Sequence, residues 1–226
     1  GTWTLYRGGL IVGEEKMRKL LLGLMLWAAP VWAEGERAGA FDYYVLALSW
    51  SPTWCALEGD ARGADQCDDR HDYGWTLHGL WPQNERGWPS YCRTSHRDAS
   101  RGQTGAMTDI MGSGGLAWHQ WKKHGRCSGL SAADYFDASR AAYTSVKRPA
   151  VFRKLQDAVK LPAKVVEEAF LESNPDLAAD MVTITCKNRR IQEVRICLTK
   201  DLEPRHCGKD VINDCSMSNA LLDPIR

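Results

Sequence analysis

Two short stretches of the chain concentrate side chains that could bind an anion and move protons. The segment Ala117–Cys127, AWHQWKKHGRC, places two histidines, two lysines and an arginine within eight residues, and it contains no carboxylate. The segment Trp75–Asn84, WTLHGLWPQN, places His78 inside an apolar run. Imidazole titrates near neutral pH, so either segment could exchange a proton with a substrate. A solvated basic surface is the alternative that these residue types leave open.

The first segment is predicted to be helical over residues 116–123, with Gly125 close to the helix end. On a helical wheel, one side carries four polar residues: His119, Gln120, Lys123 and His124. Trp118 and Trp121 fall on the other side. We therefore expect the tryptophans to enter the core, the four polar side chains to line a site, and Lys122 to point outward.

The second segment is more ambiguous, because a histidine in an apolar strand is more often a core residue than a catalyst. Gly79, directly after His78, would let another molecule approach the backbone closely. Trp81 and Pro82 offer a flat apolar wall, which could stack a base or a sugar or could simply pack in the core.

Strands are predicted near both ends of the domain, with helices between them. The strands, assigned from alternating patterns and Gly or Pro punctuation, are 41–52, 75–82 ended by Gly79 and Pro82, 181–186 and 191–200. The helices are 116–123, 131–147 with a Ser131/Asp134 capping pair, 150–160 and 163–172. Loops are predicted for 58–73, most of 94–115, and the region from 201 onward. This order favours an α+β fold, with a central, mainly antiparallel sheet flanked by several helices and held by disulfides.

The first 33 residues are expected to be absent from the working protein. Met17–Ala33 has the basic start, the apolar run of 13 residues and the small final residue of a secretory signal, although a Leu-rich helix is the alternative. Residues 1–16 precede the plausible initiator and are interpreted as an upstream extension. The remaining 34–226 should form one domain that does not enter a membrane.

Charge excludes a strong polyelectrolyte interaction over the whole surface. Removing residues 1–33 takes four basic and two acidic residues from totals of 29 and 28, which leaves 25 and 26. A domain with this balance does not bind nucleic acid through its bulk charge, so any anion site must be local.

The cysteine count indicates an oxidising compartment. All eight cysteines follow the signal: Cys55, Cys67, Cys92, Cys127, Cys186, Cys197, Cys207 and Cys215. An even number behind an export signal predicts up to four disulfides in a secreted or periplasmic protein. Zinc is the alternative, but the sequence has no CxxC pair. Spacing alone leaves about 105 connectivities open.

Taken together, WTLHGLWP and HQWKKHGRC resemble the two active-site segments of the ribonuclease T2 family. The usual second segment of that family is His-Glu-Trp-x-Lys-His-Gly-Thr-Cys. The first match covers eight consecutive residues, and the second holds at His119, Trp121, Lys123, His124, Gly125 and Cys127. The likeness extends from LALSWSPTWC to EVRICLTKDLEPRHC, and CSGLSAADYF is similar to the bacterial secreted members.

The resemblance implies cleavage of single-stranded RNA to 2′,3′-cyclic phosphate ends, without a metal or another cofactor. By position, it implies these roles: His124 as base, His78 as acid, His119 as phosphate ligand, Lys123 as stabiliser of the phosphorane, and Trp81 as a contact to a base. DNA would be unreactive because it lacks the 2′-hydroxyl, and a compact monomer is the expected state. The implied disulfides are Cys55–Cys67, Cys92–Cys127, Cys186–Cys215 and Cys197–Cys207.

The sequence departs from the family pattern at three positions. Gln120 replaces the family glutamate, which removes a charge and a proton but keeps hydrogen-bonding capacity. Arg126 replaces the usual threonine and should make the pocket more positive. Gln83, assigned to substrate binding, lies where relatives carry an acidic residue, so the base preference does not transfer.

These departures lead to three hypotheses. We predict an active but slower ribonuclease, since both histidines of the acid–base pair are present. The alternative is a noncatalytic RNA- or phosphate-binding protein of the same fold, with activity weakened by Gln120. A zinc hydrolase would use the same histidines, but His119 and His124 are five residues apart rather than the four that suit two ligands on one helix face.

Overall fold

Strand β1 (Tyr43–Trp50) lies inside a six-stranded sheet. In this computed structural model, residue 1 and residues 36–226 are described, so the predicted upstream extension and signal lie outside the described residues. Seven of the eight β1 residues are buried, because the strand is covered on both faces. β1 pairs antiparallel with β2 (Trp75–Gln83) on one side and with β5 (Arg190–Leu198) on the other.

The remaining strands extend the sheet beyond β5. β4 (Val182–Lys187) pairs antiparallel with β5, and β6 (Ala220–Leu222) meets the start of β5 in parallel at Arg190 and Leu221. β3 (Val159–Leu161) pairs antiparallel with β6. Four of the five pairings are thus antiparallel, and the expected α+β fold is confirmed.

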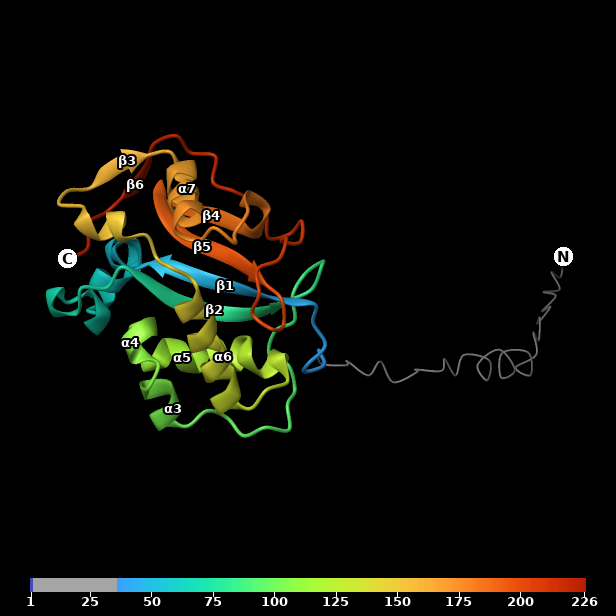
Figure 1. Ribbon diagram of the computed structural model, residues 1–226. Coiled ribbons are helices and arrows are strands. Elements are labelled where there is room, and N and C mark those ends of the chain that lie inside the picture. The colour runs from blue at the N-terminus through green and yellow to red at the C-terminus, as the bar shows by residue number, and fades with distance from the viewer. Residues whose placement is uncertain (2–35) are drawn as a thin grey trace. The chain divides into compact units, whose positions relative to one another are not determined.

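Helices cover the sheet on two sides (Figure 1). The α-helices are α2 (Ser51–Trp54), α3 (Arg101–Gly105), α4 (Thr108–Met111), α5 (Gly114–Lys123), α6 (Ala132–Ser145) and α7 (Ala163–Ser173). The short 3-10 or π turns are Cys55–Gly59, Asp60–Arg62, Asp65–Cys67, Asp69–His71, Gly125–Ser128, Ala150–Lys154 and Ala179–Met181. Helices α4, α5 and α6 contact β2, while α7 contacts β4. The predicted capping pair is present, since the Ser131 hydroxyl accepts the Asp134 amide at 3.2 Å.

Gly79 and Pro82 do not end the second strand as predicted, because β2 continues to Gln83. Pro82 is tolerated because β2 is the edge strand of the sheet. Next to Gly79 the register shifts, with Ala47 opposite Gly79 and Leu48 opposite Leu77. His78 is therefore the extra residue of a β-bulge, a device that re-aims a side chain.

Two other local predictions were wrong. The segment 94–115 contains α3, α4 and the start of α5, because Ser100 forms a capping box with Gln103 and Ser113 caps α5. These caps outweigh the glycine-rich composition. The predicted helix 150–160 is only a 3-10 turn over Ala150–Lys154, followed by β3. β3 forms because its partner β6 arrives from the C-terminal region, which was predicted to be loop.

Four disulfides hold the domain, in the pairing that the family resemblance implies: Cys55–Cys67, Cys92–Cys127, Cys186–Cys215 and Cys197–Cys207. The Cys92–Cys127 bond joins the segment after β2 to the end of the α5 region. Within residues 36–226, no helix has the length and apolar composition that a membrane crossing requires.

Candidate active site

A cleft of about 330 Å³ lies where β2, β5 and α5 meet. All seven site residues predicted from the sequence line it: His78, Trp81, Gln83, His119, Gln120, Lys123 and His124. The first three come from β2 and the others from α5 and its C-cap, so the sheet–helix contact brings the two sequence segments together.

His78 projects from the β-bulge of β2 and is half-buried, with 32% of its side chain exposed. Its Nδ1 lies 2.5 Å from Oε1 of Glu193 on β5. The ring meets the Trp81 ring edge-on, with centroids 5.2 Å apart. Nδ1 of His78 is thus held by the side chain of a residue in the same sheet.

His124 forms the C-cap of α5 and is only 6% exposed. Its ring stacks on Trp81, with centroids 5.3 Å apart and planes 27° from parallel. Burial first, and then the positive charge of Lys123, lower the pKa of His124 to about 3. Its Nδ1 is buried and has no hydrogen-bond partner among the described residues. This imidazole is therefore neutral at physiological pH.

His119 is exposed at the same cleft, and Lys123 is half-buried beside it. Partial burial of the ring, followed by the charge of Lys123, lowers the pKa of His119. Lys123 is thus the main fixed positive charge on the helix side of the cleft. On the helix side of the cleft, an anion would face Lys123 and two imidazoles whose pKa values are lowered, those of His119 and His124.

Gln120 is 2% exposed and does not project freely into the cleft. Its Oε1 accepts the indole N–H of Trp81 at 2.7 Å. A Cβ at Gly79 would lie 2.3 Å from that same Oε1 and 2.4 Å from the indole nitrogen. Gly79 is therefore needed for the close approach of Gln120 to the strand, whereas the sequence interpretation assigned this approach to another molecule.

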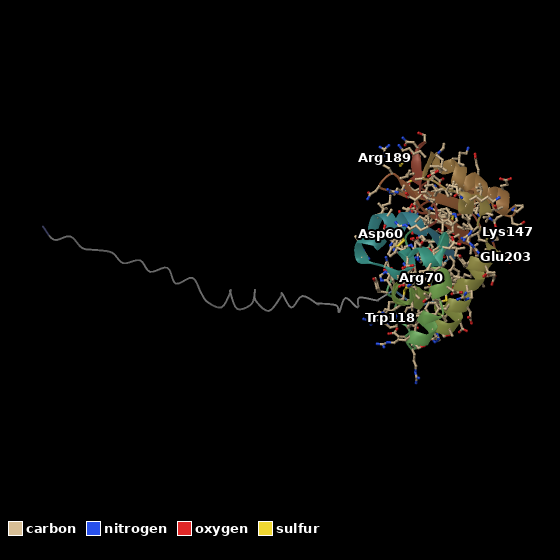
Figure 2. The ribbon with its side chains drawn as sticks, turned by 90° about the vertical axis from the view of Figure 1, so that its left-hand side faces the viewer. Asp60, Arg70, Trp118, Lys147, Arg189 and Glu203 are labelled. Atoms are coloured by element: carbon tan, nitrogen blue, oxygen red, sulfur yellow. A yellow bond between two sulfur atoms is a disulfide. The ribbon has the colours of Figure 1, made fainter. Side chains whose placement is uncertain are left out.

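Two further expectations about the helix need correction. Trp121 is fully buried, but Trp118 is 39% exposed, and Figure 2 labels it among the side chains of the described domain. The Lys122 ammonium lies 5.5 Å from the centroid of the Trp118 ring. The buried apolar residues of α5 are Ala117 and Trp121, one turn apart, and Trp118 lies outside this stripe. Arg126 does not add to the positive charge of the cleft, since it pairs with Asp98, whose carboxylate also accepts the Trp121 N–H at 3.0 Å.

Sequence reasoning missed Trp88, Arg195 and Asp210, which line the cleft. It also missed Glu193, which lines the neighbouring cavity and contacts His78. Glu193 is 1% exposed, and burial raises its pKa, but the hydrogen bond and charge of His78 and the charge of Arg195 outweigh burial and bring the pKa to about 2. The available signal was a pair of charges two residues apart in the predicted strand 191–200, which places both on one face.

A second cavity, of about 610 Å³, is also lined by His78, and by Glu193. Its further lining includes Thr76, Gln66 and Leu116. The larger of these two cavities therefore adjoins the histidine cleft and shares His78 with it.

The described residues contain one group of acidic and thiol side chains close enough to hold a metal ion, formed by Cys55, Asp60 and Cys67. Two of these three are joined in a disulfide, so their sulfurs are not free to bind a metal. His119 and His124 do not belong to such a group within the described range.

Residues 41–207 match the model of the ribonuclease T2 family, and the chain belongs to this family. A ribonuclease from Aeromonas hydrophila is 46% identical over 124 residues, which cover 53% of this chain and 54% of that protein. A ribonuclease-like storage protein from Panax ginseng is 30% identical over 163 residues, covering 62% of this chain and 59% of that protein. The chain thus spans a little over half the length of these curated relatives.

Solved structures agree on the fold. The structure of RNase NT in complex with 5′-AMP has a TM-score of 0.60 and 19% sequence identity to this chain. The superposition covers 82% of this chain and 99% of that one.

Proposed function

We propose that this protein is an endoribonuclease that cleaves single-stranded RNA by transesterification to 2′,3′-cyclic phosphate ends, without a metal ion. One observation carries the proposal. Two imidazoles flank Trp81 in one cleft, and their surroundings differ in charge: His78 contacts a carboxylate, whereas His124 is buried beside a lysine. Environments that differ in this way assign one group as acid and the other as base.

His124 is the proposed base. Because burial and Lys123 keep its imidazole neutral, it can accept the proton of the ribose 2′-hydroxyl over the whole physiological range. The 2′-oxygen then attacks phosphorus. A bound phosphate would partly offset the charge of Lys123 and make the imidazole a stronger base.

His78 is the proposed acid. The Glu193 carboxylate next to Nδ1 stabilises positive charge on the ring and leaves Nε2 free to protonate the departing 5′-oxygen. His78 also lines the larger cavity, which Trp81 does not line and which could receive the nucleotide that leaves. A substrate would then cross from one cavity to the other, as a single-stranded chain can.

Lys123 and His119 are the proposed phosphate ligands. Both line the cleft next to His124, and an ammonium placed there stabilises the charge that develops on the phosphorane oxygens. Gln120 contributes by holding Trp81, since it accepts the indole N–H.

Trp81 and Gln83 are proposed to bind the base that carries the reacting ribose, together with the exposed Trp88. The side-chain amide of Gln83 donates to the Gly87 carbonyl at 3.2 Å, so it is partly committed to the loop that carries Trp88. Stacking between aromatic rings tolerates any base, which favours broad base specificity.

The test is to mutate His78 and His124 to alanine separately and to assay cleavage of a single-stranded oligoribonucleotide. We expect each variant to lose about 10²–10⁴-fold in rate, the contribution of one acid or base. Wild-type products should carry 2′,3′-cyclic phosphate ends, activity should persist in EDTA, and DNA should remain intact. Cleavage that survives both substitutions would overturn the mechanism.

A noncatalytic RNA- or phosphate-binding protein is the second candidate. Gln120 lacks the carboxylate of the family pattern, and a base with a pKa of about 3 is a weak one. A relative named a storage protein is compatible with this alternative. Tight binding of RNA without any cyclic-phosphate product would favour it over the enzyme.

The protein is proposed to act as a monomer after export to the periplasm or the medium. Four disulfides in one domain support an oxidising compartment, and residues 17–33 would supply the signal. Mass spectrometry of the exported chain should find an N-terminus near residue 34.

A further inference from the structure

Glu193 is a buried carboxylate whose two oxygens have different partners. Oε1 lies 2.5 Å from Nδ1 of His78 and 3.4 Å from the Ser49 hydroxyl. Oε2 accepts two hydrogen bonds from the Arg195 guanidinium, at 3.0 and 2.7 Å. Glu193 is 1% exposed, so its carboxylate is shielded from bulk water.

Arg195 connects this carboxylate to the rest of the cleft. Its guanidinium lies 5.3 Å from the centroid of the Trp81 ring while it binds Glu193. A buried carboxylate is costly unless it is paired and hydrogen-bonded, and Arg195 meets both needs. Together with His78, the arginine keeps Glu193 ionised, and its two hydrogen bonds to Oε2 fix the orientation of the carboxylate.

His78 and His124, the proposed acid and base, differ in the partner of Nδ1. Nδ1 of His78 has a carboxylate acceptor, whereas Nδ1 of His124 has no partner among the described residues. An acceptor on one ring nitrogen decides which tautomer the ring adopts and where the other nitrogen points. A proton donor benefits from such an acceptor, because the carboxylate stabilises the imidazolium.

We propose that Glu193, held by Arg195, is the positioning residue of the general acid His78. It binds the Nδ1 proton, so that Nε2 faces the cleft and carries the proton that is transferred. This inference rests on the proposed ribonuclease function. In the step concerned, the 2′-oxygen bonds to phosphorus, the bond from phosphorus to the 5′-oxygen breaks, and the Nε2 proton of His78 passes to that oxygen. His124 takes the 2′-hydroxyl proton. Nδ1 of His78 keeps its own proton, which stays hydrogen-bonded to the Glu193 carboxylate.

Other charged groups also face His78 and are unchanged by a substitution at Glu193. Besides Glu193, the ring faces Arg195 from β5. From the α5 region it faces His119, Lys123 and His124. The neighbouring cavity adds Glu58, Arg62, Asp65 and Lys187. Glu193 is the acid whose oxygen contacts the ring, so its charge should dominate.

The test compares two substrates that differ only in their need for an acid. A dinucleoside monophosphate releases a strongly basic 5′-alkoxide, whereas uridine 3′-(4-nitrophenyl phosphate) releases a weakly basic phenolate that needs no proton. The variant is Glu193→Gln, which keeps the shape and removes the charge. The matched control is Asp223→Asn. It removes a carboxylate that pairs with Arg190, a residue of the same strand as Glu193, and that does not contact His78.

For Glu193→Gln we expect kcat/KM on the dinucleotide to fall about 10- to 100-fold, a part of the ~10²–10⁴ that an acid contributes. Activity on the nitrophenyl ester should stay within about twofold, because its leaving group needs no acid. Equal losses on both substrates, or no loss on either, would overturn the proposal, and the control should leave both rates unchanged.

A second measurement does not depend on activity or on a variant that folds. In the wild-type protein labelled with ¹⁵N in its imidazoles, neutral His78 should carry its proton on Nδ1. A neutral His78 with its proton on Nε2 would overturn the role of Glu193 even in an active enzyme. If instead neutral His78 carries its proton on Nδ1 but the wild-type protein cleaves neither substrate, the proposed ribonuclease function fails. The hydrogen bond from His78 to Glu193 would then still be supported.

Discussion

Restoring the missing carboxylate with Gln120→Glu is the change that most directly tests how the cleft works. The substitution preserves the local geometry, since a Glu oxygen can accept the Trp81 N–H that Gln120 Oε1 now accepts at 2.7 Å. It adds one negative charge on α5, one turn before His124. The carboxylate would be buried, but Lys123 and the indole N–H would stabilise it.

The expected size of the effect follows from Coulomb's law. Side chains one helical turn apart have Cβ atoms about 6 Å apart, and two unit charges at that distance interact by about 2.8 kcal/mol at an effective dielectric constant of about 20. This energy corresponds to about 2 pKa units. A nearby anion favours the imidazolium, so the pKa of His124 should rise from about 3 toward about 5.

The assay is the pH dependence of kcat/KM on a fluorogenic oligoribonucleotide. The base works only when it is neutral, so the acidic limb of the profile should move to higher pH by about 2 units in the variant. Near neutral pH the stronger base should raise kcat on the order of tenfold, a fraction of the ~10²–10⁴ attributed to a general base. Gln156→Glu, which adds the same charge at an exposed turn, should change neither quantity.

The reasoning is refuted if the acidic limb of Gln120→Glu coincides with that of the wild type and kcat is no higher at any pH. A Gln120→Glu variant whose kcat and kcat/KM are both lower than those of the wild type would also contradict it, provided its melting temperature is unchanged. Gln120→Leu separates the two roles of this position. It removes the acceptor for Trp81 without adding charge, and it should raise KM while leaving the acidic limb in place.

Three further predictions follow from the packing of the cleft. Trp81→Ala removes a stacking surface and should weaken binding of single-stranded RNA by about 1–3 kcal/mol in a titration. Replacing Cys92 and Cys127 by serine opens a bond across a sequence separation of 35 residues, and it should lower the free energy of unfolding in urea by about 4 kcal/mol. The folded-state pKa of His124, about 3, is below its ordinary 6.5, so between these values the unfolded chain binds the extra proton. Stability should therefore fall as pH falls through this window, and His124→Gln should flatten the decline in melting temperature.

Much of the site could be predicted from the sequence because it depends on short-range patterns. The stretch WTLHGLWP and the polar face of residues 116–123 both lie within a single element, and each spacing has a direct structural meaning. The capping pair Ser131 and Asp134 was found for the same reason. Local periodicity and residue chemistry thus determined which residues of these two segments line the cleft.

The remaining features depended on contacts between distant segments. Glu193 is 115 residues from His78, and nothing in the strand pattern says that its carboxylate meets that ring rather than solvent. The bulge at His78 arises from the register with β1, and β3 exists because β6 returns beside it. Gly79 admits Gln120 because helix and strand pack at that point.

The sequence by itself determined the residue types of the cleft, the helix and strands that carry them, and the family whose pattern they match. Tertiary structure alone decided the protonation environment of each histidine, since burial, Lys123 and Glu193 reach the two rings only after folding. Electrostatic energies depend on the distance between charges and on their exclusion from water, and a linear sequence contains neither quantity.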